Sequence, residues 1–107
     1  MNFLIGTFEL DDRDYEGIRV FTPTHAFVLI QQRGAGIASY RWSAAGVYHL
    51  AGDILTFYPR YYSHEHLAVP LTWRIRATPT GVREAQITGD ATPGREWMWR
   101  RIEPFRA

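Results

Sequence analysis

Short stretches of alternating or mostly apolar residues, separated by glycine and proline, run along this chain. The clearest is LTWRIRAT at residues 71–78, where an apolar side chain stands at every second position from Leu71 to Ala77. Threonine and arginine occupy the positions between. Successive side chains of a strand point to opposite faces, so this pattern predicts a strand with one apolar and one polar face.

The other segments are also short and rich in β-branched and aromatic residues, and no window shows a helical repeat. We therefore expect about eight strands and no long helix. They are predicted at residues 3–10, 17–22, 25–32, 44–50, 54–66 with a break at Pro59, 71–78, 82–88 and 95–103.

Turn residues predict how these strands connect. Pro79, Thr80 and Gly81 lead from one strand directly into the next, as in a hairpin, and residues 50–53 offer a second hairpin. Sequential hairpins make an antiparallel meander. With no helix to cover it, such a sheet is expected to close on itself and so remove its exposed edges. The predicted fold is all-β, a single up-and-down antiparallel barrel of about eight strands.

Length and charge narrow the function classes. A chain of 107 residues is expected to form one domain over residues 1–107. Its net charge is +1, and its arginines are scattered, so we expect no binding to nucleic acid. Cysteine is absent, which excludes disulfides, thiolate metal sites and cysteine nucleophiles.

The apolar runs also bear on location. None approaches the ~20 residues of a membrane span, and residues 1–10 lack both a basic region and a long apolar stretch. We therefore expect no contact with a membrane and a cytoplasmic location.

Four motifs, in this order, resemble those of small bacterial lipocalin-like proteins. They are LIGTF at residues 4–8, FTPTH at 21–25, GVY at 46–48 with the GD pair at 52–53, and EWMWRR at 96–101. The resemblance covers roughly residues 4–103. It implies a calycin-type barrel with an internal cavity.

The same resemblance assigns a structural role to two residues. In lipocalins an arginine of the last strand covers an aromatic residue of the first, which here implies that Arg101 covers Phe8. Small-molecule binding is the usual inference for this family, and a few barrel relatives are cofactor-free cyclases. A short chain leaves room for a small cavity only, unless a homodimer extends it.

Histidines in the segment YPRYYSHEHLAVP, residues 58–70, raise the question of a metal. On an extended strand His64 and His66 would share a face, as two ligands of one ion do. A third ligand would have to be His49 or His25, and nothing in the sequence fixes that meeting. Gly52, Asp53, Pro59 and His64 loosely resemble a cupin metal motif. The simpler interpretation is that the two histidines form hydrogen bonds with tyrosine hydroxyls, the backbone or solvent. We therefore assign no metal ligand.

Acid–base chemistry is another interpretation of the same segment. A histidine titrates near neutral pH, so His64 or His66 in an apolar barrel could transfer a proton, while Tyr58 could donate to a developing oxyanion. These three residues are the predicted catalytic groups if the protein is an enzyme.

Aromatic residues are abundant, and most are expected in the core. Trp73 lies on the apolar face of its strand and is expected to point inward, whereas Trp42, in the glycine-rich segment 33–43, is the expected gate of the cavity. The predicted ligand-binding residues are Tyr48, Tyr58, Tyr62, His64, His66, Trp73 and Trp42.

The sequence thus favours a lipocalin-like barrel that holds a small hydrophobic or amphipathic molecule and needs no cofactor. The alternative is a cofactor-independent cyclase or isomerase that uses the same cavity. A cupin-like metalloprotein is a third, weaker hypothesis.

Overall fold

A computed structural model describes residues 2–34, 41–88 and 96–102 of the chain. The described part consists of eight strands and one short 3₁₀ helix. In chain order they are β1 (Gly6–Leu10), β2 (Tyr15–Phe21), β3 (His25–Gln32), β4 (Arg41–Ala51), β5 (Ile54–Tyr62), η1 (Glu65–Leu67), β6 (Leu71–Ala77), β7 (Gly81–Thr88) and β8 (Glu96–Arg101).

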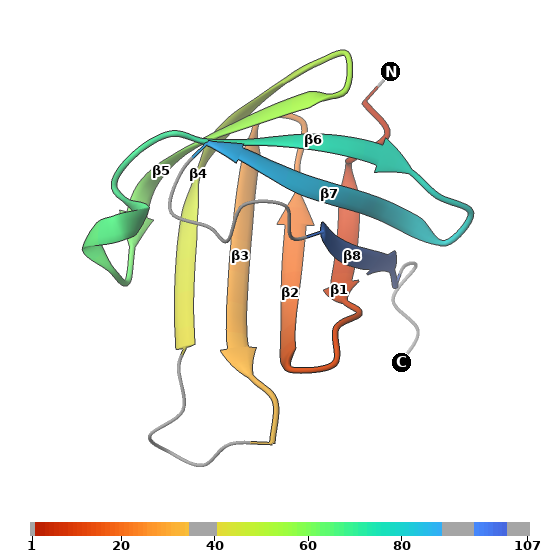
Figure 1. Cartoon of the computed structure of the whole chain (residues 1–107). Coiled ribbons are helices and arrows are strands. Elements are labelled where there is room, and N and C mark those ends of the chain that lie inside the picture. The colour runs from red at the N-terminus through yellow and green to blue at the C-terminus, as the bar shows by residue number, and fades with distance from the viewer. Residues whose placement is uncertain (1, 35–40, 89–95, 103–107) are drawn as a thin grey trace.

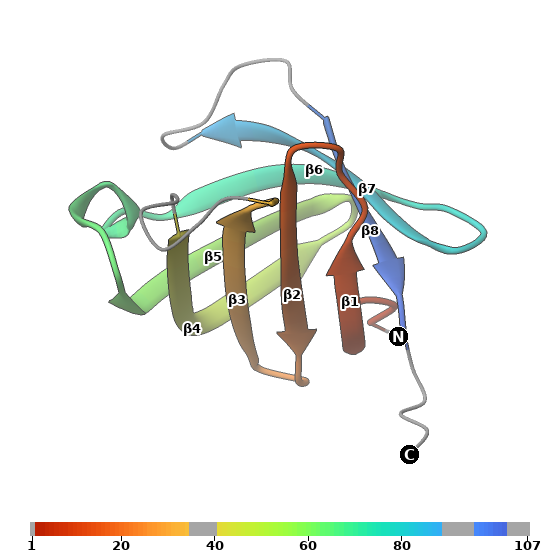
Figure 2. The same cartoon turned by 90° about the horizontal axis from the view of Figure 1, so that it is seen from below.

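Each strand pairs with the next in antiparallel fashion, and β8 pairs with β1, so the sheet closes into an up-and-down barrel. Figures 1 and 2 show β1 to β4 side by side as one wall, with β6 and β7 crossing it steeply on the other side. The predicted fold class and meander topology are confirmed. No helix within residues 2–34, 41–88 and 96–102 is long and apolar enough to cross a membrane.

Most strand boundaries differ from the predicted ones by one to four residues, and two of the differences bear on the candidate site. β4 begins at Arg41, so Trp42 belongs to a strand rather than to a loop. β5 continues through Pro59 but ends at Tyr62, short of the predicted residue 66. Pro59 is tolerated because β5 pairs with β6 only as far as Phe57, so the missing N–H costs no ladder bond on that side.

Turns follow the predicted chemistry. In the β4–β5 hairpin, Ala51 pairs with Ile54, and Gly52 between them has a φ of 62°, in the region that glycine adopts without strain. In the β6–β7 hairpin, the N–H of Thr78 donates to the carbonyl of Gly81 over 2.9 Å. Both predicted hairpins are therefore present.

Side chains fill most of the barrel interior and make one continuous core. Among the largest fully buried residues are Trp99, Phe8 and Leu55. At one end of the barrel the guanidinium of Arg101 covers the ring of Phe8, 4.6 Å from its centroid. This is the arrangement that the lipocalin resemblance implies, and it leaves the opposite end, where β4 begins and β5 ends, as the mouth.

Candidate functional site

The barrel interior contains a hollow whose wall is almost entirely apolar. The space open to the centre of a water molecule is about 20 Å³, and the total unoccupied volume, including the open mouth, is about 340 Å³. The smaller figure decides what fits without movement, which is about one water molecule; a larger molecule must occupy the mouth. Side chains of β2 to β6 line the hollow: Arg19, Phe21, Ala26, Val28, Trp42, Leu55, Phe57, Leu71 and Trp73.

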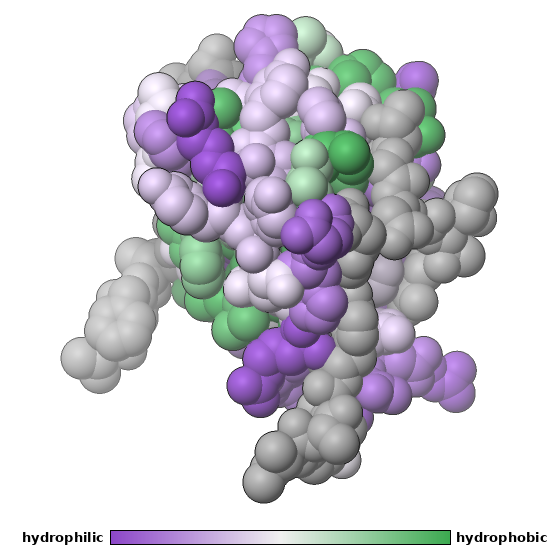
Figure 3. Space-filling model, turned by 90° about the vertical axis from the view of Figure 1, so that its left-hand side faces the viewer, coloured by the Kyte–Doolittle hydropathy of each residue, from purple (hydrophilic) through white to green (hydrophobic). Residues whose placement is uncertain are grey.

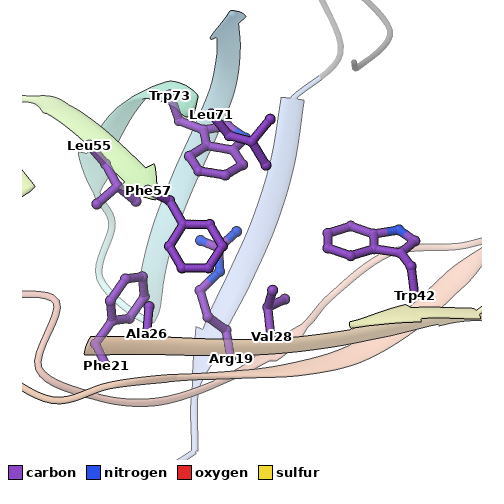
Figure 4. A pocket seen from close by; sticks show the side chains of 9 residues that line it. All are labelled: Arg19, Phe21, Ala26, Val28, Trp42, Leu55, Phe57, Leu71 and Trp73. Atoms are coloured by element: carbon purple, nitrogen blue, oxygen red, sulfur yellow. The ribbon is translucent and has the colours of Figure 1, made fainter. Parts of the chain in front are cut away.

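Among the described residues that line the hollow, Arg19 alone is charged, and it is 5% exposed. Its side chain extends across the interior towards Trp73 on the facing wall, as Figure 4 shows. The guanidinium carbon lies 4.2 Å from the ring centroid of Trp99, and between 5.4 and 5.5 Å from those of Trp73 and Phe21. Aromatic ring faces attract a cation at these distances, so the rings help to hold Arg19 inside the barrel.

Glu84 of β7 neutralises this cation. Nη1 of Arg19 donates to Oε2 of Glu84 over 2.6 Å, and Nη2 donates to Oε1 over 2.7 Å. The indole N–H of Trp99 donates to Oε1 as well, over 2.9 Å. A bidentate pair with a further donor satisfies both carboxylate oxygens, which a buried charge requires. The interior therefore carries a rigid polar centre with no net charge.

Sequence reasoning missed both members of this pair. The available signal is weak: Arg19 alternates onto the same face as Phe21, and Glu84 onto the same face as Val82. A charge on an apolar face of each of two strands, with opposite signs, would have suggested an internal ion pair.

Two of the predicted ligand-binding residues, Trp42 and Trp73, line the hollow. Trp73 is 7% exposed and points inward, as the alternation in its strand predicts. Trp42 is half-buried near the start of β4 and pairs with the buried Ile30, so its ring lies on the inner face near the mouth. Their part in ligand binding stays a prediction.

Tyr48 lies at the closed end, away from the lining of the hollow. Its ring packs edge-on against Phe21, with centroids 5.1 Å apart. Its hydroxyl donates to the carbonyl of Thr22 over 2.6 Å and accepts from the side-chain amide of Asn2 over 2.5 Å. Burial raises the pKa of Tyr48, and the hydrogen bond from Asn2 opposes part of that rise. These contacts give Tyr48 a structural role, and its predicted part in ligand binding stays a prediction.

Tyr58 and Tyr62, on the half of β5 that extends beyond β6, are 44% and 42% exposed. Tyr58 pairs with Val47, and Tyr62 pairs with Ala44, whose side chain is buried. Paired residues of an antiparallel sheet share a face, so Tyr62 is on the inner side at the mouth and Tyr58 on the outer side. Figure 3, which views the β4–β5 side, shows residues of intermediate hydropathy among hydrophobic and strongly hydrophilic ones.

The two histidines do not share a strand face, because β5 ends before them. His64 is the residue that precedes η1, and the backbone of residue 66 lies within that helix. The expected ligand spacing on an extended strand is therefore wrong. Nδ1 of His64 lies 2.7 Å from the hydroxyl oxygen of Ser63. The side chain of His66 lies outside what the structure describes.

No three histidine, aspartate or glutamate side chains of the described segments come together as a metal site would require. His25 and His49, the candidates for a third ligand, are both exposed, on β3 and β4 respectively. Tyr58 and His64 are not among the described residues that line the hollow. The catalytic roles expected for His64, His66 and Tyr58 stay predictions.

Comparisons with protein-family models, with curated proteins and with solved structures found no match to this chain. The chemistry of the site must therefore be argued from its own residues. They provide an apolar wall, aromatic rings and one buried, neutralised guanidinium, an arrangement suited to binding a small apolar molecule that carries few polar groups.

Proposed function

We propose that this barrel binds a small, largely apolar molecule at its mouth, in the hollow between Trp42 and Trp73, as lipocalin-like proteins do. The observation that carries the proposal is the lining of the hollow: of the nine lining side chains in the described segments, eight are apolar or aromatic, and the ninth is Arg19. Binding sites for small molecules typically combine such a wall with very few placed polar groups.

The resemblance to lipocalin-like proteins supports the same function. The closed eight-stranded sheet and the contact of Arg101 with Phe8 are both features that the resemblance implies. Because one fold hosts many activities, the contents of the hollow carry more weight than the fold.

Size limits the ligand. Only about 20 Å³ of the interior is open to the centre of a water molecule, so a ligand of one or two rings must enter from the mouth and lie against Trp42. Trp42 is half-buried near the start of β4.

Titration with 2-isopropylnaphthalene, followed by ¹H–¹⁵N spectra, tests the proposal. We expect saturable shifts of the indole N–H signals of Trp42 and Trp73. Val28→Phe fills the hollow and should abolish them, because Val28 is 5% exposed and lines the wall. Val47→Phe makes the same change on the outer face, where Val47 pairs with the exposed Tyr58, and should leave binding intact.

Two results would overturn the proposal. One is the absence of any saturable shift in the wild-type protein. The other is an unchanged affinity in a Val28→Phe variant whose spectrum is that of a folded barrel.

A further inference from the structure

The polar centre of the hollow limits the chemistry of what can bind there. Arg19 and Glu84 are the only buried charged residues among those described, and each neutralises the other. A guanidinium has five N–H groups, of which two donate to Glu84. No other described residue accepts a hydrogen bond from Arg19. The remaining N–H groups can therefore serve a molecule in the hollow that Arg19 lines.

The described side chains of the lining offer hydrogen-bond donors and no acceptor. Arginine has no acceptor atom, and the indole nitrogens of Trp42 and Trp73 are donors only. The nearby carboxylate of Glu84 is engaged at both oxygens, by Arg19 and by Trp99. A ligand group that donates a hydrogen bond would lose its bonds to water without replacement, whereas one that accepts finds a partner.

Charge distinguishes between the possible acceptors. A carboxylate beside Arg19 would have to share the guanidinium with Glu84, and the interior would then carry a net negative charge. An unpaired charge in an apolar site is costly, and two carboxylates on one cation leave one of them uncompensated. A carbonyl oxygen accepts the same hydrogen bond and brings no charge.

We propose that the hollow selects an uncharged ring compound with a carbonyl acceptor, such as an aryl ketone, and rejects the matching carboxylate. The inference rests on the proposed function and names the ligand class of the same site. The carbonyl oxygen accepts from Arg19, and the rings lie between Trp42 and Trp73.

Three naphthalenes whose substituents have three heavy atoms each provide the test in the wild-type protein: 2-acetylnaphthalene, 2-naphthoate and 2-isopropylnaphthalene at neutral pH. The ketone should bind about tenfold more tightly than the isopropyl compound, because it gains a hydrogen bond from a cation. Naphthoate should bind at least about tenfold more weakly than the ketone. Isothermal calorimetry gives the dissociation constants.

Two variants then assign the selectivity to the ion pair. In Glu84→Gln the guanidinium is no longer neutralised, so naphthoate should bind at least as tightly as the ketone. In the double variant Arg19→Met with Glu84→Met, the ketone should lose its advantage over the isopropyl compound. The double variant replaces the buried pair by apolar groups and so avoids a lone buried charge.

The outcomes separate the two proposals. If none of the three compounds binds, the proposed function fails. If they bind but wild-type protein prefers naphthoate, or does not distinguish the ketone from the isopropyl compound, the inference about ligand class is overturned and the binding function stands. A variant that does not fold leaves the comparison in the wild-type protein decisive.

Discussion

Arg101 closes one end of the barrel over Phe8. Besides lying 4.6 Å from the ring centroid, its guanidinium donates from Nη1 to the carbonyl of Ile5 over 2.9 Å and from Nη2 to that of Phe3 over 2.6 Å. One side chain thus joins the last described strand to the segment that precedes the first.

Arg101→Ala should lower the free energy of unfolding by about 1–3 kcal/mol, since it removes a cation–π contact and two hydrogen bonds to carbonyls. Urea denaturation measures the change. Arg100→Ala is the matched control on the opposite face, where Arg100 pairs with Glu9 and both side chains are about half exposed. That surface pair should contribute less than about 1 kcal/mol. Equal losses in the two variants would contradict the closing role of Arg101.

The buried pair of Arg19 and Glu84 should be strongly coupled. Glu84→Met leaves a buried guanidinium without its counter-charge and should cost about 3–5 kcal/mol of unfolding free energy. The double variant with Arg19→Met should cost much less than the sum of the two single changes. A double-mutant cycle from denaturation curves measures this coupling, and additive effects would argue against the pair as a unit.

Tyr48 should make stability depend on alkaline pH. Burial raises its pKa in the folded state, whereas the unfolded chain has the ordinary value of about 10. Above pH 10 the unfolded chain releases a proton that the folded protein still holds. The stabilisation is therefore complete below pH 10 and is lost as the pH rises through the folded pKa.

Tyr48→Phe removes this titration, so the free energy of unfolding should fall less steeply above pH 10 than in the wild-type protein. At neutral pH the variant should lose about 1 kcal/mol, because the hydrogen bond to the Thr22 carbonyl is gone. Tyr61→Phe, at a side chain 77% exposed, is the control at neutral pH and should change stability little. Denaturation curves across pH measure the effect. If Tyr48 has no such effect, the free energy of unfolding will fall equally steeply above pH 10 in Tyr48→Phe and in the wild-type protein.

Two glycines should respond differently to alanine. A Cβ at Gly46 would lie 2.0 Å from the carbonyl oxygen of Tyr58, so Gly46→Ala must push β4 and β5 apart and should cost about 2 kcal/mol or more. Gly52→Ala meets no atom within 4 Å and bears only the strain of its positive φ, about 1–2 kcal/mol. Thermal unfolding that ranks Gly52→Ala as the more damaging change would be inconsistent with the close approach at Gly46.

The fold could be predicted from sequence where period-two alternation and turn chemistry agree. In β6 the buried positions Leu71, Trp73 and Ile75 alternate with exposed arginines, and a turn with proline and glycine follows. Both signals are local, so the sequence of one strand and its turn suffices to predict the hairpin. Closure of the sheet followed from the number of hairpins and the lack of a helix.

The end of β5 could not be predicted in this way. Pairing with β6 stops at Phe57, and the chain then turns through η1, which brings Leu67 into the core at 3% exposure. Burial of Leu67 depends on tertiary contacts that the local pattern does not contain. The histidine spacing therefore suggested a strand where the chain makes a helical turn.

The buried pair of Arg19 and Glu84 could not be predicted from the sequence for a related reason. In β2 the apolar Ile18 and Val20 occupy one face, and Arg19 shares the other face with Phe21, so the pattern does not show which face is inside. Arg19 is buried because Glu84, 65 residues later in the chain, neutralises it. A partner so distant in sequence is found only when the barrel has closed.

Closure has a consequence for the order of events in biosynthesis. β1 pairs with β8 through Phe8, Glu9 and Leu10, which face Arg101, Arg100 and Trp99. Until residues 96–101 leave the ribosome, β1 and β7 each present an unpaired edge, and such edges invite pairing with other chains. Arg19 lies on β2 and Glu84 on β7. These two strands can meet only across the β1–β8 pairing or through the barrel interior. The free edge of β1 must therefore stay unpaired until β8 has been synthesised.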